Sequence, residues 1–192
     1  MKNTKFILAS ASPRRFELLG ELGIIPSVCP TDADESITEP LSPAKTVELL
    51  SMRKAQAYKK VLSDNEILIT ADTVVALGNK ILGKPKDKQD AIDMLSSLSD
   101  TNHTVCTGIT LSSKNKTVTV HDMTTVCFRK MTTQEIVDYV ETGDPLDKAG
   151  AYGIQGEAGK FVKEISGSLN NVIGLPTELV RKILSEEFNI KF

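Results

Sequence analysis

Strand-like and helix-like segments alternate along this chain, and that alternation restricts the folds it can adopt. Apolar residues recur at every second position in some segments, as in a strand, and at every third or fourth position in others, as in an amphipathic helix. Helices mixed with tight hairpins and longer crossovers predict an α/β fold with a mixed sheet. We predict strands over residues 5–10, 67–77, 80–83, 103–112, 117–128 and 160–165, and helices over 13–22, 44–62, 133–142 and 176–188, with one more helix after Asp87.

The composition is that of an ordinary globular protein, 40% hydrophobic and 25% charged, with a net charge of −2. This charge provides no bulk attraction to nucleic acid or to an anionic membrane, so any anion site must be built locally. The apolar runs are too short for a secretory leader or a membrane span. Three cysteines without a CxxC pair favour a reducing compartment. We therefore expect a cytoplasmic protein that binds neither nucleic acid nor membrane.

Two arginines stand at the start of the first predicted helix, where a cation is unfavourable. Ser12 and Pro13 form a typical helix start, with a hydroxyl N-cap followed by proline. The helix dipole is positive at this end, so anions are favoured there. Arg14 and Arg15 are either solvated, or they join the helix N–H groups and the hydroxyls of Ser10 and Ser12 in a phosphate or carboxylate site.

Asp72 interrupts EILITADTVVAL, which is otherwise the sequence of a buried strand. Aspartate is rare in strands, and a buried carboxylate without a partner is costly. Asp72 is therefore either a cap at a strand end or bulge, or a metal ligand or general base. Thr73 beside it offers a hydroxyl group.

Two lysines, Lys54 and Lys84, are candidates for a functional site because of their positions in the predicted elements. Lys54 falls on the apolar stripe of the helix predicted over 44–62, so its ammonium either extends past its neighbours to solvent or points at a ligand. A two-residue turn at Gly78-Asn79 would pair Thr73 with Lys84. Lys84 is then either an ordinary surface lysine or a second cation near the aspartate of that strand.

An acidic, proline-containing segment over residues 29–41 reads as a loop. Such loops are usually solvated. Mg²⁺, however, needs one or two carboxylates, and Glu35 with Asp72 could supply them. His103 and Cys106 lie three residues apart on a predicted strand and point to opposite faces, so we assign neither as a metal ligand.

These residues together are the parts that phosphoryl chemistry uses: cations and a metal ion to absorb charge, and a carboxylate to orient or deprotonate water. The chain contains no GxxxxGK[ST] phosphate loop, and GAYGIQG does not match the dinucleotide pattern GxGxxG. Composition and spacing therefore predict an enzyme that acts on a phosphate ester or anhydride.

Several motifs resemble those of the Maf family of nucleoside triphosphate pyrophosphatases. They occur in the family's order and span nearly the whole chain: LASASPRRFELL, ADTVV, GKP, HTVCTGI, DKAGAYGIQG and NNVIGLP. The resemblance implies a single domain over residues 1–192 with two lobes around a central cleft. It implies an elongated, curved, mixed β-sheet flanked by helices, as in Maf and ITPase proteins, and a homodimer.

The resemblance also implies an activity, the hydrolysis of a nucleoside triphosphate between its α and β phosphates to a monophosphate and pyrophosphate, with Mg²⁺ or Mn²⁺ as cofactor. By motif, Asp72, Lys54 and Lys84 resemble the catalytic residues. Glu35 with Asp72 resembles the metal-binding pair. The phosphate loop is represented by Ser10, Ser12, Arg14 and Arg15.

Three positions match the branch of the family that acts on dTTP and UTP, and modified pyrimidine nucleotides or CTP are further candidates. These positions are Arg14, Thr73 and Gln155. The chain departs from the family at Asp100, where glycine is frequent, and at Leu169, where an aromatic residue is common. Neither departure touches the expected chemistry.

Two other functions remain open from the sequence. One is a purine pyrophosphatase that acts on ITP or XTP, which a comparison of ITP and dTTP turnover would detect. The other is a nucleotide-binding regulator of cell division without turnover, since the family was named for a septum phenotype. The complete set of Asp72, Lys54 and Lys84 argues against the regulator, because a pure binder needs no base.

Overall fold

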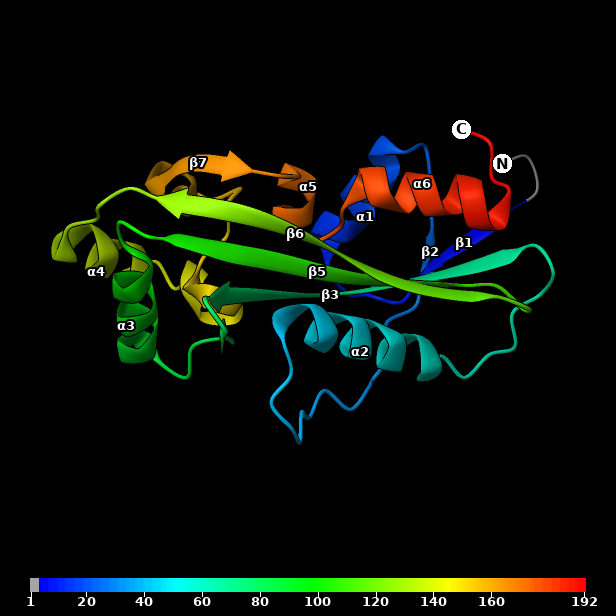
Figure 1. Ribbon diagram of the computed structural model, residues 1–192, viewed down its shortest axis with the longest axis horizontal. Helices are drawn as coiled ribbons and strands as arrows, with labels where there is room; N and C mark the ends of the chain where they lie inside the picture. The colour runs from blue at the N-terminus through cyan, green and yellow to red at the C-terminus, as the bar shows by residue number, and fades with distance from the viewer. Residues whose placement is uncertain (1–3) are drawn as a thin grey trace. The chain divides into compact units, whose positions relative to one another are not determined.

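The computed structural model describes residues 4–192 and contains one mixed β-sheet (Figure 1). The strand order is β2-β1-β3-β5-β6-β7, with β4 paired to β3. β1 runs parallel to β2 and β3, whereas β4 and β7 pair antiparallel to their neighbours, which confirms the predicted α/β class. The strands are β1 (Lys5–Leu8), β2 (Ser27–Val28), β3 (Glu66–Leu77), β4 (Lys80–Leu82), β5 (Asn102–Ser112), β6 (Thr117–Phe128) and β7 (Val162–Ser166).

Six α-helices and three short 3₁₀ helices lie among the described residues. No helix of this part of the chain is long and apolar enough to cross a membrane. The α-helices are α1 (Pro13–Glu21), α2 (Pro43–Gln56), α3 (Lys88–Leu98), α4 (Thr133–Glu141), α5 (Leu169–Ile173) and α6 (Thr177–Phe188). The 3₁₀ helices are η1 (Asp144–Asp147), η2 (Ala149–Ala151) and η3 (Glu157–Phe161).

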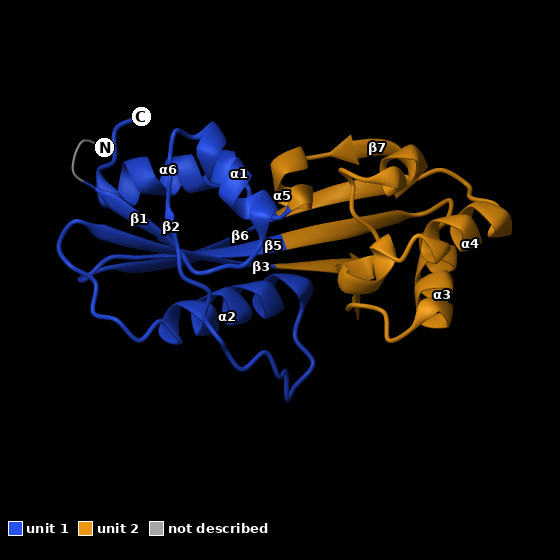
Figure 2. Ribbon diagram, turned by 180° about the vertical axis from the view of Figure 1, so that it is seen from behind, with its two compact units in different colours: residues 1–72, 107–122, 174–192 blue, residues 73–106, 123–173 orange. Residues whose placement is uncertain are grey.

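The chain divides into two compact units (Figure 2). Unit 1 comprises residues 1–72, 107–122 and 174–192, and unit 2 comprises residues 73–106 and 123–173. In unit 1, α1 and α6 cover one face of the strands and α2 covers the other (Figure 1). Because both faces are covered, the unit 1 part of β3 is buried continuously from Ile67 to Asp72, as expected for a central strand with helices on both sides.

Unit 2 has its own core, built from α3, α4 and the strand segments of that unit. Its largest fully buried side chains are aromatic: Phe128, Tyr139 and Phe161. The rings of Tyr139 and Phe161 meet edge to face at 5.6 Å between centroids, a favourable arrangement of aromatic pairs. α4 begins with the capping box of Thr132 and Glu135.

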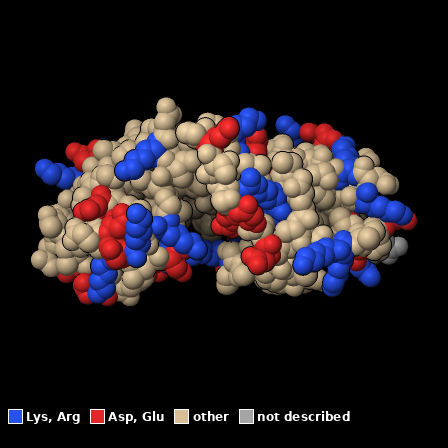
Figure 3. Space-filling model, turned by 90° about the horizontal axis from the view of Figure 1, so that it is seen from below, with Lys and Arg blue, Asp and Glu red and all other residues tan. Residues whose placement is uncertain are grey.

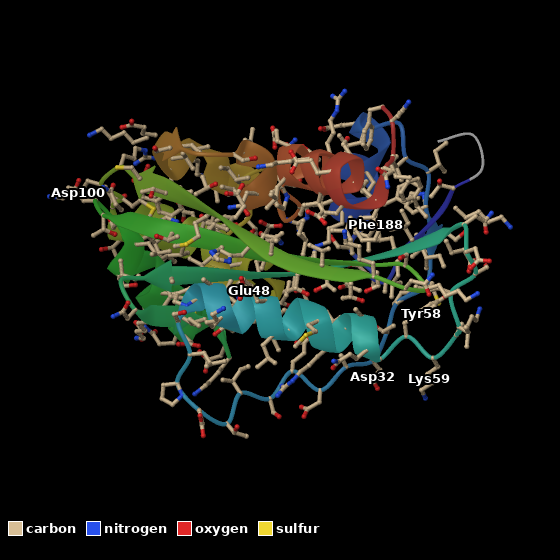
Figure 4. All side chains as sticks on the ribbon, turned by 45° about the vertical axis from the view of Figure 1, so that its right-hand side comes forward. Asp32, Glu48, Tyr58, Lys59, Asp100 and Phe188 are labelled. Atoms are coloured by element: carbon tan, nitrogen blue, oxygen red, sulfur yellow. The ribbon has the colours of Figure 1, made fainter. Side chains whose placement is uncertain are left out.

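The helix predicted over 44–62 is too long at its C-terminal end. α2 ends at Gln56, and Tyr58 lies just beyond it (Figure 4). Tyr58 packs against a small group of buried side chains from β1 and β3. Val61, which the helical period would place on the apolar stripe, is 90% exposed. Packing against the sheet therefore overrides helical periodicity in this segment.

Other differences concern short elements and single positions. The helical period places Phe16, Leu19 and Leu22 on the apolar face of the first predicted helix. Leu19 is buried as expected, but Leu18 is buried as well and Phe16 is exposed. β2, α5 and the 3₁₀ helices have two to five residues each, which is too short to show a period. Asp100 has a φ of 57°, a left-handed conformation that glycine adopts more easily.

The turn at Gly78-Asn79 joins β3 and β4 in the predicted register. Paired residues run from Leu77 opposite Lys80 to Val75 opposite Leu82. β4 ends at Leu82, so the predicted partner positions Thr73 and Lys84 lie beyond the observed pairs. The turn chemistry was thus sufficient to set the register.

His103 is buried on β5 beside Phe128 and Tyr152. Its Nε2 lies 2.8 Å from the Tyr152 hydroxyl, and its Nδ1 has no hydrogen-bond partner among the described residues. Burial lowers the pKa of His103 to about 4. A protonated ring would therefore be a buried cation with an unpaired N–H group.

Acid is expected to destabilise the protein through His103. An unfolded histidine titrates near pH 6.5 and the folded one near 4. The unfolded state therefore binds more protons between these values, and stability falls as the pH drops through them. The loss should reach about 3 kcal/mol near pH 4. Urea unfolding of the protein and of His103→Gln across this range measures it, and an equal pH slope in both would contradict the assignment.

Candidate active site

Three charged side chains meet where the end of α2 faces β3. The Lys54 ammonium lies 2.5 Å from Oδ1 of Asp72 and 2.9 Å from Oε1 of Glu35. The side chains of Lys54 and Asp72 are 16% and 12% exposed, whereas that of Glu35 is 61% exposed. This charged cluster of Glu35, Lys54 and Asp72 combines two carboxylates with one ammonium, and so it favours a further cation at its exposed side.

The acidic loop is held in place from both sides of Glu35. Nη1 of Arg53 donates to the carbonyl oxygens of Asp34 and Ser36, at 3.2 and 2.6 Å. The Thr31 hydroxyl donates to the carbonyl of Lys54 at 3.0 Å. Asp34 Oδ1 accepts the Ser36 N–H, which lowers the pKa of Asp34. Asp34 therefore shapes the loop, and Glu35 is the carboxylate that reaches Lys54.

Buried hydroxyl groups and one glycine fix α2 against the sheet. The Thr70 hydroxyl donates to the Ser51 carbonyl at 2.7 Å, and Ser51 Oγ lies 3.0 Å from Thr110 Oγ1. α2 also packs closely on β5 at Gly108, where a Cβ atom would lie 2.3 Å from the Val47 carbonyl oxygen. Only glycine permits this contact, and α2 carries Lys54 towards Asp72 as a result.

Gly108→Ala is expected to destabilise the protein by about 1–3 kcal/mol, because the added methyl group overlaps backbone atoms of α2. Gly20→Ala is the matched control in the same unit. A Cβ there meets nothing within 4 Å, and alanine favours a helix, so stability should be unchanged or higher. Urea unfolding compares the two variants, and equal stability would contradict the close approach of α2 to β5.

Arg15 ties the start of α1 to the strand that carries Asp72. Its Nε donates to the Gly174 carbonyl at 2.9 Å, and Nη1 donates to the Ala71 carbonyl at 2.9 Å and to Ser10 Oγ at 3.2 Å. Burial lowers the pKa of the Arg15 guanidinium, and the nearby Asp72 carboxylate opposes that shift. Arg15 therefore acts as a bridge between three segments of unit 1.

The remaining polar groups at the start of α1 have fewer protein partners. Ser12 is the N-cap, as predicted, but its hydroxyl accepts no hydrogen bond from the helix, and its N–H donates to Ser10 Oγ at 3.3 Å. Across residues 4–192, nothing forms a hydrogen bond or ion pair with the half-buried Arg14 guanidinium. Arg14 at a helix N-terminus is a suitable donor for an anion.

Three of the predicted site residues belong to unit 2. Thr73 follows Asp72 on β3 and is half-buried. Lys84 is exposed, two residues beyond the end of β4, and Gln155 is exposed in the turn between η2 and η3. Within unit 1, direct contacts join two groups of predicted site residues: Ser10, Ser12 and Arg15 in one, and Glu35, Lys54 and Asp72 in the other.

Sequence reasoning does not identify Arg53 or Thr31 as part of this region. Arg53 lies in the last turn of α2, where a cation interacts favourably with the helix dipole, so its position gives no sign of a functional role. The partners of Arg53 are backbone carbonyls 17 and 19 residues away. Backbone acceptors carry no residue-specific signal, so only the structure could reveal this contact.

A ready-made metal centre is absent from the residues that the structure describes, because no three His, Cys, Asp or Glu side chains converge. Glu35 and Asp72 nevertheless share one ammonium. Mg²⁺ is usually held by one or two carboxylates together with waters and substrate phosphates. The donor set therefore fits a Mg²⁺ ion that arrives with a phosphate ligand.

The face shown in Figure 3 has no large patch of one charge, because basic and acidic side chains are interspersed on it. The net charge of the chain is −2. A long polyanion would find no continuous basic track on this face.

Comparisons with known proteins identify relatives over the full length of the chain. Proteins named "dTTP/UTP pyrophosphatase" from Bacillus pumilus and Alkaliphilus metalliredigens are each 45% identical to it, over 97% of this chain and 97% of their own. A protein of the same name from Bacillus cytotoxicus is 47% identical, over 93% of this chain and 94% of its own.

A solved structure, that of the Staphylococcus aureus Ham1 protein, shares the fold. It covers 96% of this chain and 100% of its own, with a TM-score of 0.54 and 16% sequence identity. A model of the family described as "Maf-like protein" matches residues 5–187. With this match and relatives of 45% identity along its whole length, the chain belongs to the Maf family.

Proposed function

We propose that this protein hydrolyses nucleoside triphosphates, dTTP and UTP above all, between the α and β phosphates, to give the monophosphate and pyrophosphate. The observation that carries the proposal is the contact of one half-buried lysine with two carboxylates, Lys54 with Asp72 and Glu35. Its full-length relatives named dTTP/UTP pyrophosphatase support the choice of substrate.

A divalent cation, Mg²⁺ or Mn²⁺, is part of the proposal. Glu35 and Asp72 would hold it, since both carboxylates contact the same Lys54 ammonium and Glu35 is largely solvent-accessible. When bound, such an ion neutralises phosphate charge and positions the phosphate oxygens. Lys54 would then bind the substrate phosphates while remaining next to Asp72.

Asp72 acts as the general base in this proposal. Its carboxylate accepts a proton from the attacking water, the oxygen of that water bonds to the α phosphorus, and the bond from that phosphorus to the bridging oxygen breaks. Pyrophosphate leaves. The burial of Asp72 limits its exchange with bulk water, and its contact with Lys54 fixes one carboxylate oxygen in place.

The start of α1 binds the distal phosphates in this proposal. Arg14, the hydroxyls of Ser10 and Ser12, and the N-terminal turn of the helix supply the donors. Arg15 holds this turn to Ala71, next to the base, through the bonds described above. Lys84 contributes a further cation from unit 2.

Thr73 and Gln155, with Arg14, give the preference for thymine and uracil in this proposal. The Gln155 amide has a donor and an acceptor, which complement O4 and N3–H of these bases. A site built for such a pair rejects bases that leave it unpaired. Modified pyrimidine nucleotides and CTP are further substrates, and we also propose a cytoplasmic homodimer that acts on free nucleotides rather than on nucleic acid or membranes.

A nucleotide screen tests the function as a whole. The protein is incubated with dTTP, UTP, CTP, GTP, ITP and XTP, each with Mg²⁺ or Mn²⁺, and the products are resolved by chromatography. We expect the highest kcat/KM with dTTP and UTP, and pyrophosphate as the second product. Preferential turnover of ITP would replace the proposal with a purine pyrophosphatase, and tight binding without turnover would replace it with a regulator.

A further inference from the structure

The hydroxyl of Tyr139 is the centre of a hydrogen-bond network inside unit 2. Tyr139, on α4, is fully buried, and its hydroxyl donates to Oδ2 of Asp144 at 2.8 Å. Asp144 opens η1, so one phenol joins the end of α4 to the start of η1.

Lys148 fixes the carboxylate to which Tyr139 donates. Its ammonium donates to the Asp144 carbonyl at 2.6 Å, to Asp144 Oδ1 at 2.9 Å and to Asp147 Oδ1 at 2.8 Å. The Lys148 side chain is mostly buried. All three ammonium protons therefore have acceptors, and Oδ2 of Asp144 is left oriented towards Tyr139. Hydrogen bonds to charged groups are stronger than neutral ones, so this arrangement is rigid.

The turn that carries Gln155 rests on this network. The Gly156 N–H donates to the Gly153 carbonyl at 3.1 Å, which closes a turn over residues 153–156. A Cβ atom on Gly156 would lie 3.5 Å from Oδ2 of Asp144, so the turn packs directly on that carboxylate. Gly153 is buried and Gln155 is exposed. The turn is therefore anchored at its base and presents Gln155 at its tip.

We infer that Tyr139 and Asp144 are positioning residues for base selection, which hold the turn over residues 153–156 so that Gln155 meets the pyrimidine edge. This inference rests on the proposed function, in which Gln155 reads the base. It adds that selectivity depends on a buried phenol and carboxylate that do not contact the substrate. Removal of the hydroxyl leaves Oδ2 of Asp144, on which the turn packs, without its donor, and the turn loosens.

Tyr139→Phe tests the inference, because it removes only the oxygen atom. We expect the ratio of kcat/KM for dTTP to that for GTP to fall roughly fivefold or more, the effect of one lost buried hydrogen bond. The loss should appear as a higher KM for dTTP with little change in kcat, since the charged cluster is untouched. The backbone amide of Gly156, whose hydrogen bond to the Gly153 carbonyl closes the turn, should exchange with solvent at least about tenfold faster.

Tyr152→Phe is the matched control. Tyr152 is also a buried tyrosine of unit 2, but its hydroxyl contacts His103 and not the turn. Loss of the Tyr152 hydroxyl should cost comparable stability, while the dTTP-to-GTP ratio and the exchange of the Gly156 amide stay as in the unmodified protein. A fall in the ratio in both variants would mean that general loosening of unit 2 is responsible, and would overturn the inference.

Gln155→Ala separates the inference from the function on which it rests. If Gln155→Ala lowers the dTTP-to-GTP ratio and Tyr139→Phe does not, Gln155 reads the base but needs no support from Tyr139, and the inference is wrong. If neither variant changes the ratio while dTTP is still hydrolysed, the base-reading role of Gln155 is wrong, and so is the inference that rests on it.

We expect the Tyr139→Phe/Gln155→Ala double variant to have the same dTTP-to-GTP ratio as Gln155→Ala alone. Unchanged exchange of the Gly156 amide in Tyr139→Phe would by itself overturn the inference.

Discussion

Asp72→Asn is expected to lower kcat for dTTP by ~10²–10⁴-fold while the protein stays folded, because the amide cannot accept the proton of the attacking water. The drop should be larger if metal binding is lost as well. The asparagine keeps the size of the side chain and an oxygen that can accept from the Lys54 ammonium, which at present lies 2.5 Å from Asp72. Steady-state kinetics with dTTP and a thermal unfolding curve measure the two effects.

Asp64→Asn is the control for this substitution. Asp64 belongs to the same unit and also pairs with a lysine, Lys114, but it is largely exposed. Its replacement should leave kcat within about twofold, since exposed ion pairs contribute little. Near-normal turnover by a folded Asp72→Asn protein would reduce Asp72 to a structural cap.

Lys54→Ala is expected to lower kcat by ~10²–10³-fold, the usual cost of removing one donor that stabilises developing negative charge. It should also lower the melting temperature. An apolar stripe by itself would predict the opposite, since alanine removes a charge from it. The structure shows instead that Lys54 contacts two carboxylates, so its removal leaves the buried Asp72 without its ion-pair partner and close to Glu35.

Lys45→Ala serves as the control on the same helix, because Lys45 is exposed and pairs only with Glu48 across one turn. Its activity and melting temperature should stay close to those of the unmodified protein. Lys54→Arg keeps the charge and should retain more stability than Lys54→Ala. If Lys54→Ala were fully active, Lys54 would be a solvated lysine without a role in the reaction.

The elements that the sequence predicts well are those with strong local signals. The strand around Asp72 is long and apolar. Gly78-Asn79 is typical of a hairpin turn, and Ser12-Pro13 is typical of a helix start. The end of α2 could not be predicted, because the segment after Gln56 has good helix formers and neither glycine nor proline. Contacts of Tyr58 with the sheet decide where that helix stops, and such contacts have no local signal.

The charged cluster was predictable as a set of unusual residues but not as an arrangement. Asp72 and Lys54 are each out of place in their own pattern, whereas Glu35 lies in an unpatterned loop and depended on the family resemblance. The contact between Lys54 and both carboxylates requires the close approach of α2 at Gly108, a residue that looks unremarkable in its strand. The backbone partners of Arg15 were equally inaccessible to sequence reasoning.

The central claim, that Asp72 directs water to the α phosphorus, is tested most directly by the position of solvent oxygen in the products. dTTP is hydrolysed by the protein in water enriched in oxygen-18, and the products are examined by ³¹P NMR and mass spectrometry. We expect the label in the thymidine monophosphate, with unlabelled pyrophosphate as the only other product. Label in pyrophosphate, or formation of a nucleoside diphosphate and orthophosphate, would contradict the account.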